Sequence, residues 1–189
     1  MGKYVSAEEA VKIVKSGDRV YLQAAAAAPT VLSNALTERA SELKNVEICH
    51  LHTEGDARYA NPEYAASFHV NSFFIGANVR HTLKTGNGSY TPVFLSELPQ
   101  LFRKKVLNLD VVFIHVSPPD VHGYCSLGTS VEATLAAIEF AKKVVAQVNP
   151  QMPRTFGDGI LHVSEIDLLV EVDTPIYSHS LEESSPLED

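Results

Sequence analysis

The stretch V-S-P-P-D-V-H-G-Y-C-S-L-G, residues 116–128, lies between an apolar run that ends at Val116 and a helix-like run that begins at Val131. Pro118 and Pro119 can neither continue a strand ladder nor occupy a helix interior. The two glycines allow backbone conformations that other residues disfavour. The stretch is therefore a structured strand-to-helix loop, and in an α/β fold such loops lie at the carboxyl end of the sheet, where ligands bind.

Strand-like and helix-like segments alternate on both sides of this loop. Strands are predicted at 18–23, 46–51, 68–75, 109–116, 144–148 and 166–172, with an edge strand at 90–95; helices are predicted at 7–17, from Pro29 to about Leu43, near 96–102 and at 131–141. Most of the strands are continuous apolar runs, which favours a parallel sheet buried on both faces. The sequence predicts an α/β fold, an open and mostly parallel sheet with helices on both faces.

The composition limits the class of protein. A net charge of −8 over 189 residues, without a stripe of Lys and Arg, argues against nucleic-acid binding. No apolar run approaches the roughly 18 residues of a membrane span, and no signal pattern opens the chain. Two cysteines make no disulfide framework, which favours a reduced, cytoplasmic compartment. We expect one domain over 1–177, followed by an acidic linker or disordered tail over 178–189.

Five alanines, residues 24–28, connect the first strand to the helix that begins at Pro29. Small residues let a strand turn tightly into a helix. They also let a ligand approach backbone N–H groups at a helix N-terminus, a place that favours anions or a developing oxyanion. Gln23, Ala24, Ala25 and Pro29 are therefore candidates for one wall of a ligand cleft. No G-x-G-x-x-G or Walker A pattern is present, so a nucleotide phosphate loop is not supported.

Several further strand ends carry polar side chains. His50 and His52 have metal-like spacing on a strand, but no third ligand is evident, and buried hydrogen-bonded histidines are the alternative. Glu54, beside Gly55, follows the same strand and is either a general base or substrate contact, or a solvated turn residue. Arg80, with Asn78, follows the next strand and suits the binding of a carboxylate, or else an interdomain or helix-capping salt bridge.

The loop at 116–128 contains Asp120, His122 and Gly123. A Ser-His-Asp triad with Ser126 lacks the G-x-S-x-G elbow, and no base is evident for Cys125 as a nucleophile. Asn149 ends another strand, where its amide could simply satisfy loop backbone. The loops after Gln23, Leu51, Val116 and Val148 are expected to meet at one edge of a parallel sheet, which predicts a ligand site there.

The combined pattern resembles the acetyl-CoA hydrolase/transferase family, which includes acetate, butyrate and 4-hydroxybutyrate CoA-transferases. The resemblance covers nearly all of residues 5–175 in family order. It rests on G-D-R-V at 17–20 with Pro29, H-L-H-T-E-G at 50–55, F-F-I-G-A-N-V-R at 73–80, P-V-F-L-S-E-L-P at 92–99, the loop at 116–128 and A-Q-V-N-P-Q-M-P-R-T-F-G-D at 146–158. Within the family, the pattern is most similar to the 4-hydroxybutyrate and butyrate/acetate types.

The resemblance implies a protein of two similar α/β domains, of which this chain is similar to the N-terminal one. The family moves CoA from an acyl-CoA to a free carboxylate through a glutamyl-CoA thioester. The glutamate belongs to the second domain, so no catalytic residue is expected in this chain. The implied partners are acyl-CoA and carboxylate substrates, the missing C-terminal domain and, for the complete protein, copies of itself in a homo-oligomer. No permanently bound cofactor and no metal are expected. The five alanines depart from the glycine or more varied residues expected in that loop.

Three functions are carried forward. The first is the N-terminal half of a CoA-transferase, which would be catalytically incomplete alone. The second is an acyl-CoA hydrolase of the same family, or a self-sufficient thioesterase that uses Ser126, Cys125 or His122. The third is a non-catalytic module that binds acyl-CoA.

Overall fold

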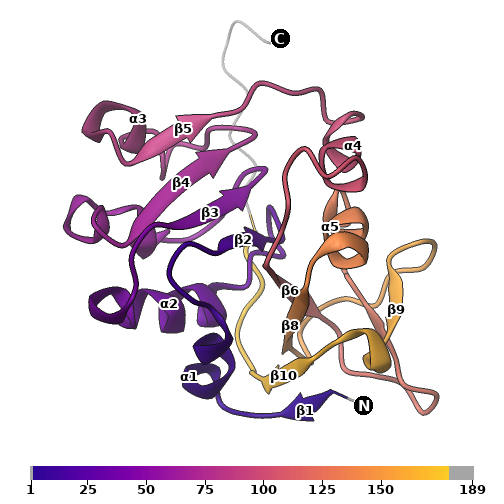
Figure 1. The fold of residues 1–189 in the computed structure, drawn as a ribbon. Helices are drawn as coiled ribbons and strands as arrows, with labels where there is room; N and C mark the ends of the chain where they lie inside the picture. The colour runs from indigo at the N-terminus through magenta and orange to yellow at the C-terminus, as the bar shows by residue number, and fades with distance from the viewer. Residues whose placement is uncertain (1, 179–189) are drawn as a thin grey trace, which may run out of the picture.

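The computed structural model describes residues 2–178, and the predicted tail from 179 onward lies outside the described residues. Helices and strands alternate as the sequence predicts (Figure 1). The strands are β1 (Lys3–Tyr4), β2 (Arg19–Leu22), β3 (Val46–His50), β4 (Phe68–Ser72), β5 (Gly88–Tyr90), β6 (Val111–Val116), β7 (Tyr124–Ser126), β8 (Lys143–Val148), β9 (Ile160–His162) and β10 (Leu168–Glu171). The α-helices are α1 (Ala7–Ala10), α2 (Thr30–Glu38), α3 (Thr82–Thr85), α4 (Leu98–Arg103) and α5 (Thr134–Phe140). Short 3₁₀ turns occupy Val11–Ile13, Ala40–Glu42, Arg58–Ala60, Pro62–Tyr64 and Val163–Glu165.

Within residues 2–178, eight strands form one parallel sheet in the order β1-β10-β8-β6-β2-β3-β4-β5. From β2 the chain moves outward through β3, β4 and β5. It then returns to the other side of β2 as β6 and moves outward again through β8 and β10. The strand order therefore reverses between β2 and β6, and open α/β sheets bind ligands at such a switch point.

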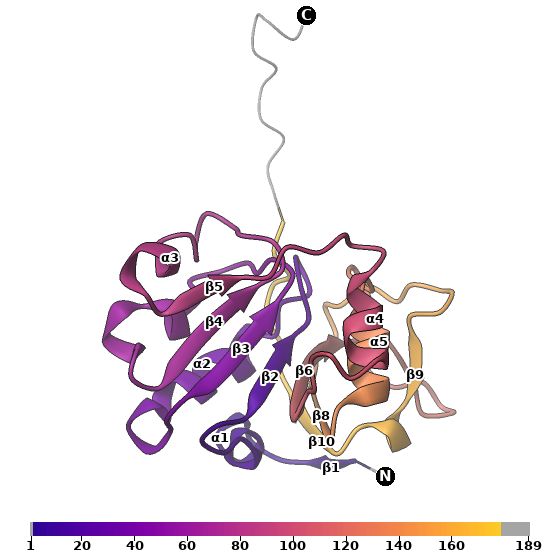
Figure 2. The ribbon, with the colours of Figure 1, turned by 45° about the horizontal axis from the view of Figure 1, so that its top comes forward.

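Successive residues of the central strands point to opposite faces of the sheet. On one face, Leu22 of β2 and Phe113 of β6 pack with Leu32 and Leu36 of α2 and with residues of α1. On the other face, Tyr21 and Val112 pack with helices α4 and α5. Figures 1 and 2 show the two helix pairs on either side of the sheet. The predicted helix-covered parallel sheet is confirmed.

The bounds of several predicted elements differ in the structure; strand β4, for example, ends at Ser72 rather than at 75. The segment 90–95 is not an edge strand, because β5 ends at Tyr90 and Pro92 can donate no ladder hydrogen bond. The first helix leaves its α form after Ala10, although the Ser6 hydroxyl accepts the Glu9 N–H at 3.2 Å as an N-cap. Helix α2 ends at Glu38, and α5 begins at Thr134 rather than at 131.

The sequence does not predict the small antiparallel sheet of β7 and β9. This lobe, which comprises residues 118–128 and 152–165, projects from the main sheet beyond β8 and β10 (Figure 1). Each of its strands has only three residues, too few for an alternating pattern to be recognised. The proline-rich loop thus builds part of a separate lobe before the chain enters α5.

Candidate functional site

The carboxyl ends of β2 and β6 lie side by side at the switch point. The β2 end continues as Gln23, whose N–H donates to the Phe113 carbonyl at 3.0 Å. The Gln23 side chain is fully buried. Its amide donates to the carbonyls of Leu127 and Ser130 at 2.9 and 2.7 Å, and its oxygen accepts the N–H of His115 at 2.7 Å. Gln23 therefore ties β2 to β6 and to the chain that leads into α5.

The alanine loop that follows is held on both sides. Ala24 donates its N–H to Glu132 Oε1 at 3.0 Å, and Ala25 donates to the His52 carbonyl, also at 3.0 Å. Ala25 has a φ of 54°, in the left-handed region that residues with a Cβ disfavour. Within residues 2–178, the amides that donate no hydrogen bond in this loop are those of Ala26 and Ala27. Only part of the loop is thus free to act as the N–H wall that the sequence suggests.

A cavity of about 250 Å³ opens beside this loop, at the carboxyl ends of β3 and β4. It is lined by His52, Thr53, Glu54, Gly55, Phe74, Gly76, Ala77 and Asn78. The Asn78 amide donates to the carbonyls of Thr53 and Gly55 at 2.9 and 3.0 Å, and Ala25 forms a bridge with Thr53. The structure therefore brings together the predicted residues Ala25, Glu54, Gly55 and Asn78.

Arg80 lies two residues after Asn78 and is exposed. Within residues 2–178 its guanidinium forms no ion pair or hydrogen bond, so it makes no helix-capping salt bridge there, and an interdomain salt bridge stays a prediction. A guanidinium without a partner can bind a carboxylate or phosphate with two parallel hydrogen bonds.

His50 and His52 do not form a metal site. Strand β3 ends at His50, which is fully buried, whereas His52 belongs to the loop. Burial lowers the pKa of His50 to about 4, so the ring is neutral at physiological pH. No cluster of three or more His, Cys, Asp or Glu suited to a metal occurs within the part of the chain that the structure describes. Of the buried, hydrogen-bonded histidine interpretation, His50 fits the burial but not the hydrogen bonds, because neither of its ring nitrogens has a partner among the described residues.

Asn149 belongs to a buried polar network at the carboxyl end of β8. His115 Nε2 accepts from the amides of Asn149 and Gln147, at 3.0 and 3.3 Å. The Gln147 oxygen accepts the N–H of Val31 in the first turn of α2 at 3.1 Å, and Asn149 also donates to the Thr174 carbonyl at 2.8 Å. The network joins β6, β8, α2 and the segment after β10. The sequence did not single out His115, although its place near the end of an otherwise apolar strand was the signal.

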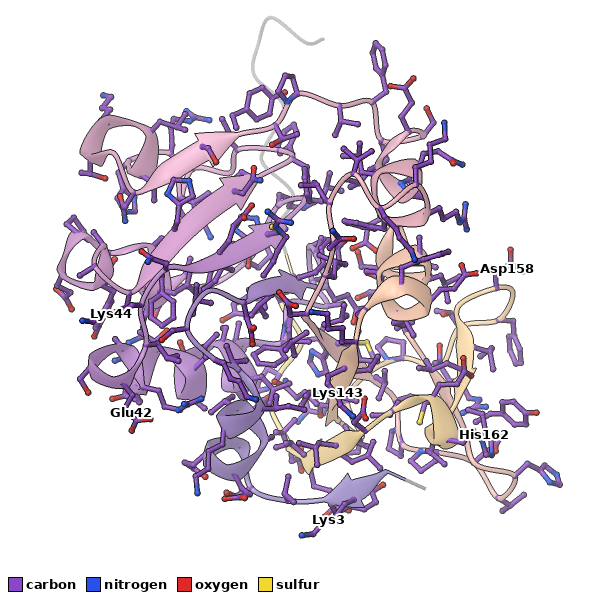
Figure 3. All side chains as sticks on the ribbon, in the orientation of Figure 1. Lys3, Glu42, Lys44, Lys143, Asp158 and His162 are labelled. Atoms are coloured by element: carbon purple, nitrogen blue, oxygen red, sulfur yellow. The ribbon has the colours of Figure 1, made fainter. Side chains whose placement is uncertain are left out.

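Asp120, His122 and Gly123 belong to the β7–β9 lobe rather than to the 250 Å³ cavity. The Asp120 carboxylate accepts the N–H groups of His122 and Tyr124, both at 2.9 Å, and pairs with Arg154 at 2.8 Å. These bonds, the Tyr124 amide first, lower the pKa of Asp120. His162, labelled in Figure 3, lies in this lobe, and its ring contacts the His122 carbonyl at 3.2 Å. Asp120 thus closes a turn, and its carboxylate stabilises the loop.

The prolines of the loop contribute to another cavity. Its volume is about 460 Å³, and it is lined by Tyr4, Pro118, Pro119, Val148, Pro150, Glu171, Val172 and Asp173. The cavity contains none of the polar residues predicted for the cleft. The loop therefore shapes the carboxyl edge through its prolines.

Ser126 and Cys125 are both placed as structural residues. The Ser126 hydroxyl is fully buried and accepts the N–H groups of Gly128 and Thr155 at 3.1 and 3.0 Å. Burial raises the pKa of Cys125 to about 11, so the thiolate that a nucleophile needs is suppressed. Cys49 is a second buried free thiol.

Glu132 is the site residue that the sequence did not reveal. Its carboxylate accepts the Ala24 N–H and, at 2.8 Å, the Thr134 hydroxyl, and burial raises its pKa. No spacing rule connects residue 24 with residue 132, because the contact depends on the order in which the strands are placed in the sheet. The only available signal was a lone glutamate just before an apolar helix.

These features define an open parallel α/β domain. Its strand order reverses between β2 and β6, and open α/β sheets bind ligands in the loops at such a point. The chain matches the model of the acetyl-CoA hydrolase/transferase N-terminal domain over residues 1–177, and it belongs to that family. The resemblance deduced from the sequence is confirmed. No helix among the described residues is long and apolar enough to cross a membrane.

The curated relatives are CoA-transferases. The chain is 40% identical over 184 residues to a succinyl-CoA:acetate/propanoyl-CoA:succinate CoA transferase from Fasciola hepatica, and 41% identical over 174 residues to a 4-hydroxybutyrate coenzyme A transferase from Clostridium kluyveri. These alignments cover 96% and 92% of this chain but 38% and 41% of the relatives. The chain thus spans about two fifths of the length of these relatives.

Solved structures give the same fold. RipA from Yersinia pestis superposes with a TM-score of 0.90 at 26% identity, over 97% of this chain and 45% of that one. A 4-hydroxybutyrate CoA-transferase from Porphyromonas gingivalis superposes with a TM-score of 0.80 at 35% identity, over 94% of this chain and 41% of that one.

Proposed function

We propose that this chain is the N-terminal half of a CoA-transferase that moves CoA between an acyl-CoA and a short-chain carboxylate such as acetate, butyrate or 4-hydroxybutyrate. Family membership supports the reaction class. The assignment to the N-terminal half is supported by the match to the N-terminal domain model and by relatives more than twice as long as this chain. The observation that carries the proposal is the cavity at the carboxyl edge that Glu54, Gly55 and Asn78 line, with Ala25 of the alanine loop bridged to Thr53 of the same lining.

In the proposed reaction, a glutamate outside this chain attacks the thioester carbonyl and expels the CoA thiolate. The thiolate then attacks the resulting anhydride at the glutamyl carbonyl, which releases the first carboxylate and leaves a glutamyl-CoA thioester. A carboxylate is a poor nucleophile unless it is positioned and shielded from water. The role proposed for this chain is to supply one wall of the cleft.

Three groups of residues would form this wall of the cleft. The loop at Gln23, Ala24, Ala25 and Pro29 forms one side, and the loop at Glu54 and Gly55 forms the other. Arg80 and Asn78 complete it, with the guanidinium available to an anionic part of the substrate. Contacts from Asp120, His122, Gly123 and Asn149 to the substrate remain predictions. The side chains of Asp120 and Asn149 are already hydrogen-bonded within the protein.

The segment after β10 supports placing the second half at this edge. It passes Asn149 at Thr174, and a Cβ added at Gly55 would lie 2.5 Å from the Tyr177 hydroxyl. The segment after β10 therefore lies against the 53–55 loop at Tyr177.

The test is an assay of the 189-residue chain with butyryl-CoA and labelled acetate, alone and after the C-terminal half of a family relative is joined or added. We expect no transfer by the chain alone and labelled acetyl-CoA once the second half is present. Free CoA without labelled acetyl-CoA would instead indicate a hydrolase. Robust turnover by the chain alone would refute the proposal.

A further inference from the structure

Glu132 is a partly buried carboxylate at the switch point, in the segment between β7 and α5. Its two oxygens accept from two different donors, the Ala24 N–H at 3.0 Å and the Thr134 hydroxyl at 2.8 Å. Removal of a carboxylate from water is costly unless it gains such bonds, and burial raises the pKa of this one. A carboxyl group removed from water, with each oxygen accepting from a different part of the chain, is therefore a candidate for a specific role.

Ala24, which donates its N–H to Glu132, is followed by a residue with a strained backbone conformation. Ala25, with its φ of 54°, follows Ala24 directly, and its own N–H donates to His52. A left-handed conformation costs a residue with a Cβ about 1–2 kcal/mol, and it persists only where neighbouring contacts impose it. The bonds from the Ala24 and Ala25 N–H groups hold the two peptide units that flank Ala24, the second of which leads into Ala25. Gln23 anchors the end of β2 immediately before them.

We propose that Glu132 is a positioning residue that holds the 24–28 loop in the conformation that forms the wall of the candidate cleft. The proposal rests on the function proposed above, in which this loop contacts the acyl-CoA. Hydrogen bonds to ionised acceptors are roughly twice as strong as neutral ones, which suits a loop of alanines that has no side chains of its own to fix it. Glu132 acts through the loop and need not touch the substrate.

The chemistry of the two donors distinguishes the useful variants. E132A leaves the buried Ala24 N–H without an acceptor. E132Q can keep its oxygen toward Ala24, because the Thr134 hydroxyl can accept as well as donate and so can receive the new NH₂ group. E139Q and E139A are matched controls, since Glu139 lies on α5 and forms only a long, exposed pair with Arg103 at 3.8 Å.

The first readout is amide hydrogen exchange at Ala24 and Ala25 in the ¹⁵N-labelled 189-residue chain. E132A should raise exchange there by about tenfold or more, the equivalent of one hydrogen bond to a charged group, while strands β3 and β8 keep their protection. E132Q should restore most of the protection, and the Glu139 variants should match the unaltered chain. Unchanged exchange at Ala24 in a folded E132A chain would overturn the proposal. If E132A does not fold, the T134V variant is measured instead, because it removes the hydroxyl that orients the Glu132 carboxylate. Increased exchange at Ala24 in T134V supports the proposal, and unchanged exchange overturns it.

The second readout is the Kd for butyryl-CoA, measured by calorimetry on the same variants. E132A should weaken binding by about tenfold, with rescue by E132Q, since a loop released from its clamp no longer forms the wall. Increased exchange with unchanged affinity would overturn the link to the cleft. If the unaltered chain binds no butyryl-CoA, the proposed function is weakened, and the exchange result still decides whether Glu132 holds the loop.

Discussion

At the scale of single residues, buried polar side chains organise the carboxyl edge. Gln147 is fully buried and joins the His115 ring to the first turn of α2 through the Val31 N–H. A buried donor left without its acceptor costs about 1–3 kcal/mol, more than the net value of an ordinary hydrogen bond. The network therefore matters most for what its loss would leave unpaired.

We expect Q147L to lower the free energy of unfolding by about 2 kcal/mol, because the Val31 N–H and the His115 ring both lose a partner while the volume stays similar. Urea denaturation of the 189-residue chain measures this change. Q100L is the control, since Gln100 is exposed on α4 and the same substitution should leave stability nearly unchanged. Equal effects of the two substitutions would contradict this account.

Stability should also fall in mild acid because of two buried histidines. Burial lowers the pKa of both His50 and His115 to about 4 in the folded chain, below the ordinary value of 6.5. Between these values the unfolded chain binds protons that the folded chain does not, so stability is greatest above about pH 6.5 and falls toward pH 4. Each histidine should contribute a loss of about 2 kcal/mol between about pH 7 and about pH 5.

Urea midpoints across this pH range measure the effect. H50Q should remove about half of the pH-dependent fall, whatever it does to stability at neutral pH. H122Q should leave the fall intact, because His122 is exposed. A stability that is flat from pH 7 to pH 5 would show that the two rings are not buried as neutral groups.

At the scale of elements, the apolar strands were predictable and the short or polar segments were not. Strand β6 is buried at every position, and its sequence is apolar except at His115. By contrast, β7 and β9 have three residues each. The 90–95 segment was predicted as an edge strand despite Pro92, whereas the strand there, β5, ends at Tyr90. Of the candidate site, Glu54, Gly55 and Asn78 were found because they follow strand ends. Glu132 was missed because its partner lies 108 residues away in the sequence.

The β7–β9 lobe offers a matched pair of glycine substitutions. Gly123 and Gly157 both have positive φ, 85° and 95°, so alanine at either position is strained by about 1 kcal/mol. A Cβ at Gly123 would lie 2.6 Å from the His162 ring, whereas a Cβ at Gly157 meets nothing within 4 Å. We expect G123A to destabilise the chain clearly more than G157A in thermal unfolding. Similar losses would mean that the ring of His162 moves aside freely.

At the scale of the whole molecule, two exposed apolar clusters lie outside the core. One comprises Tyr90, the last residue of β5, with Phe94 and Leu95 on the connection from β5 to α4. The other comprises Val121, Tyr124 and Phe156 in the lobe, where the Asp120–Arg154 pair joins the two segments. Phe94 is 76% exposed and Phe156 is 90% exposed, which soluble monomers tolerate singly but rarely in clusters.

These clusters lead us to expect the 189-residue chain to self-associate, because each can bury apolar surface against another molecule. Sedimentation velocity over a wide concentration range should show a rising mean mass, and F94S or F156S should reduce it according to which cluster forms the contact. K44S is the control, since Lys44 is exposed and lies far from His162 and its lobe (Figure 3). A chain that stays monomeric at every concentration would contradict the expectation. Association that survives both serine substitutions would place the contact on another face, such as the cavity between Tyr4 and the two prolines.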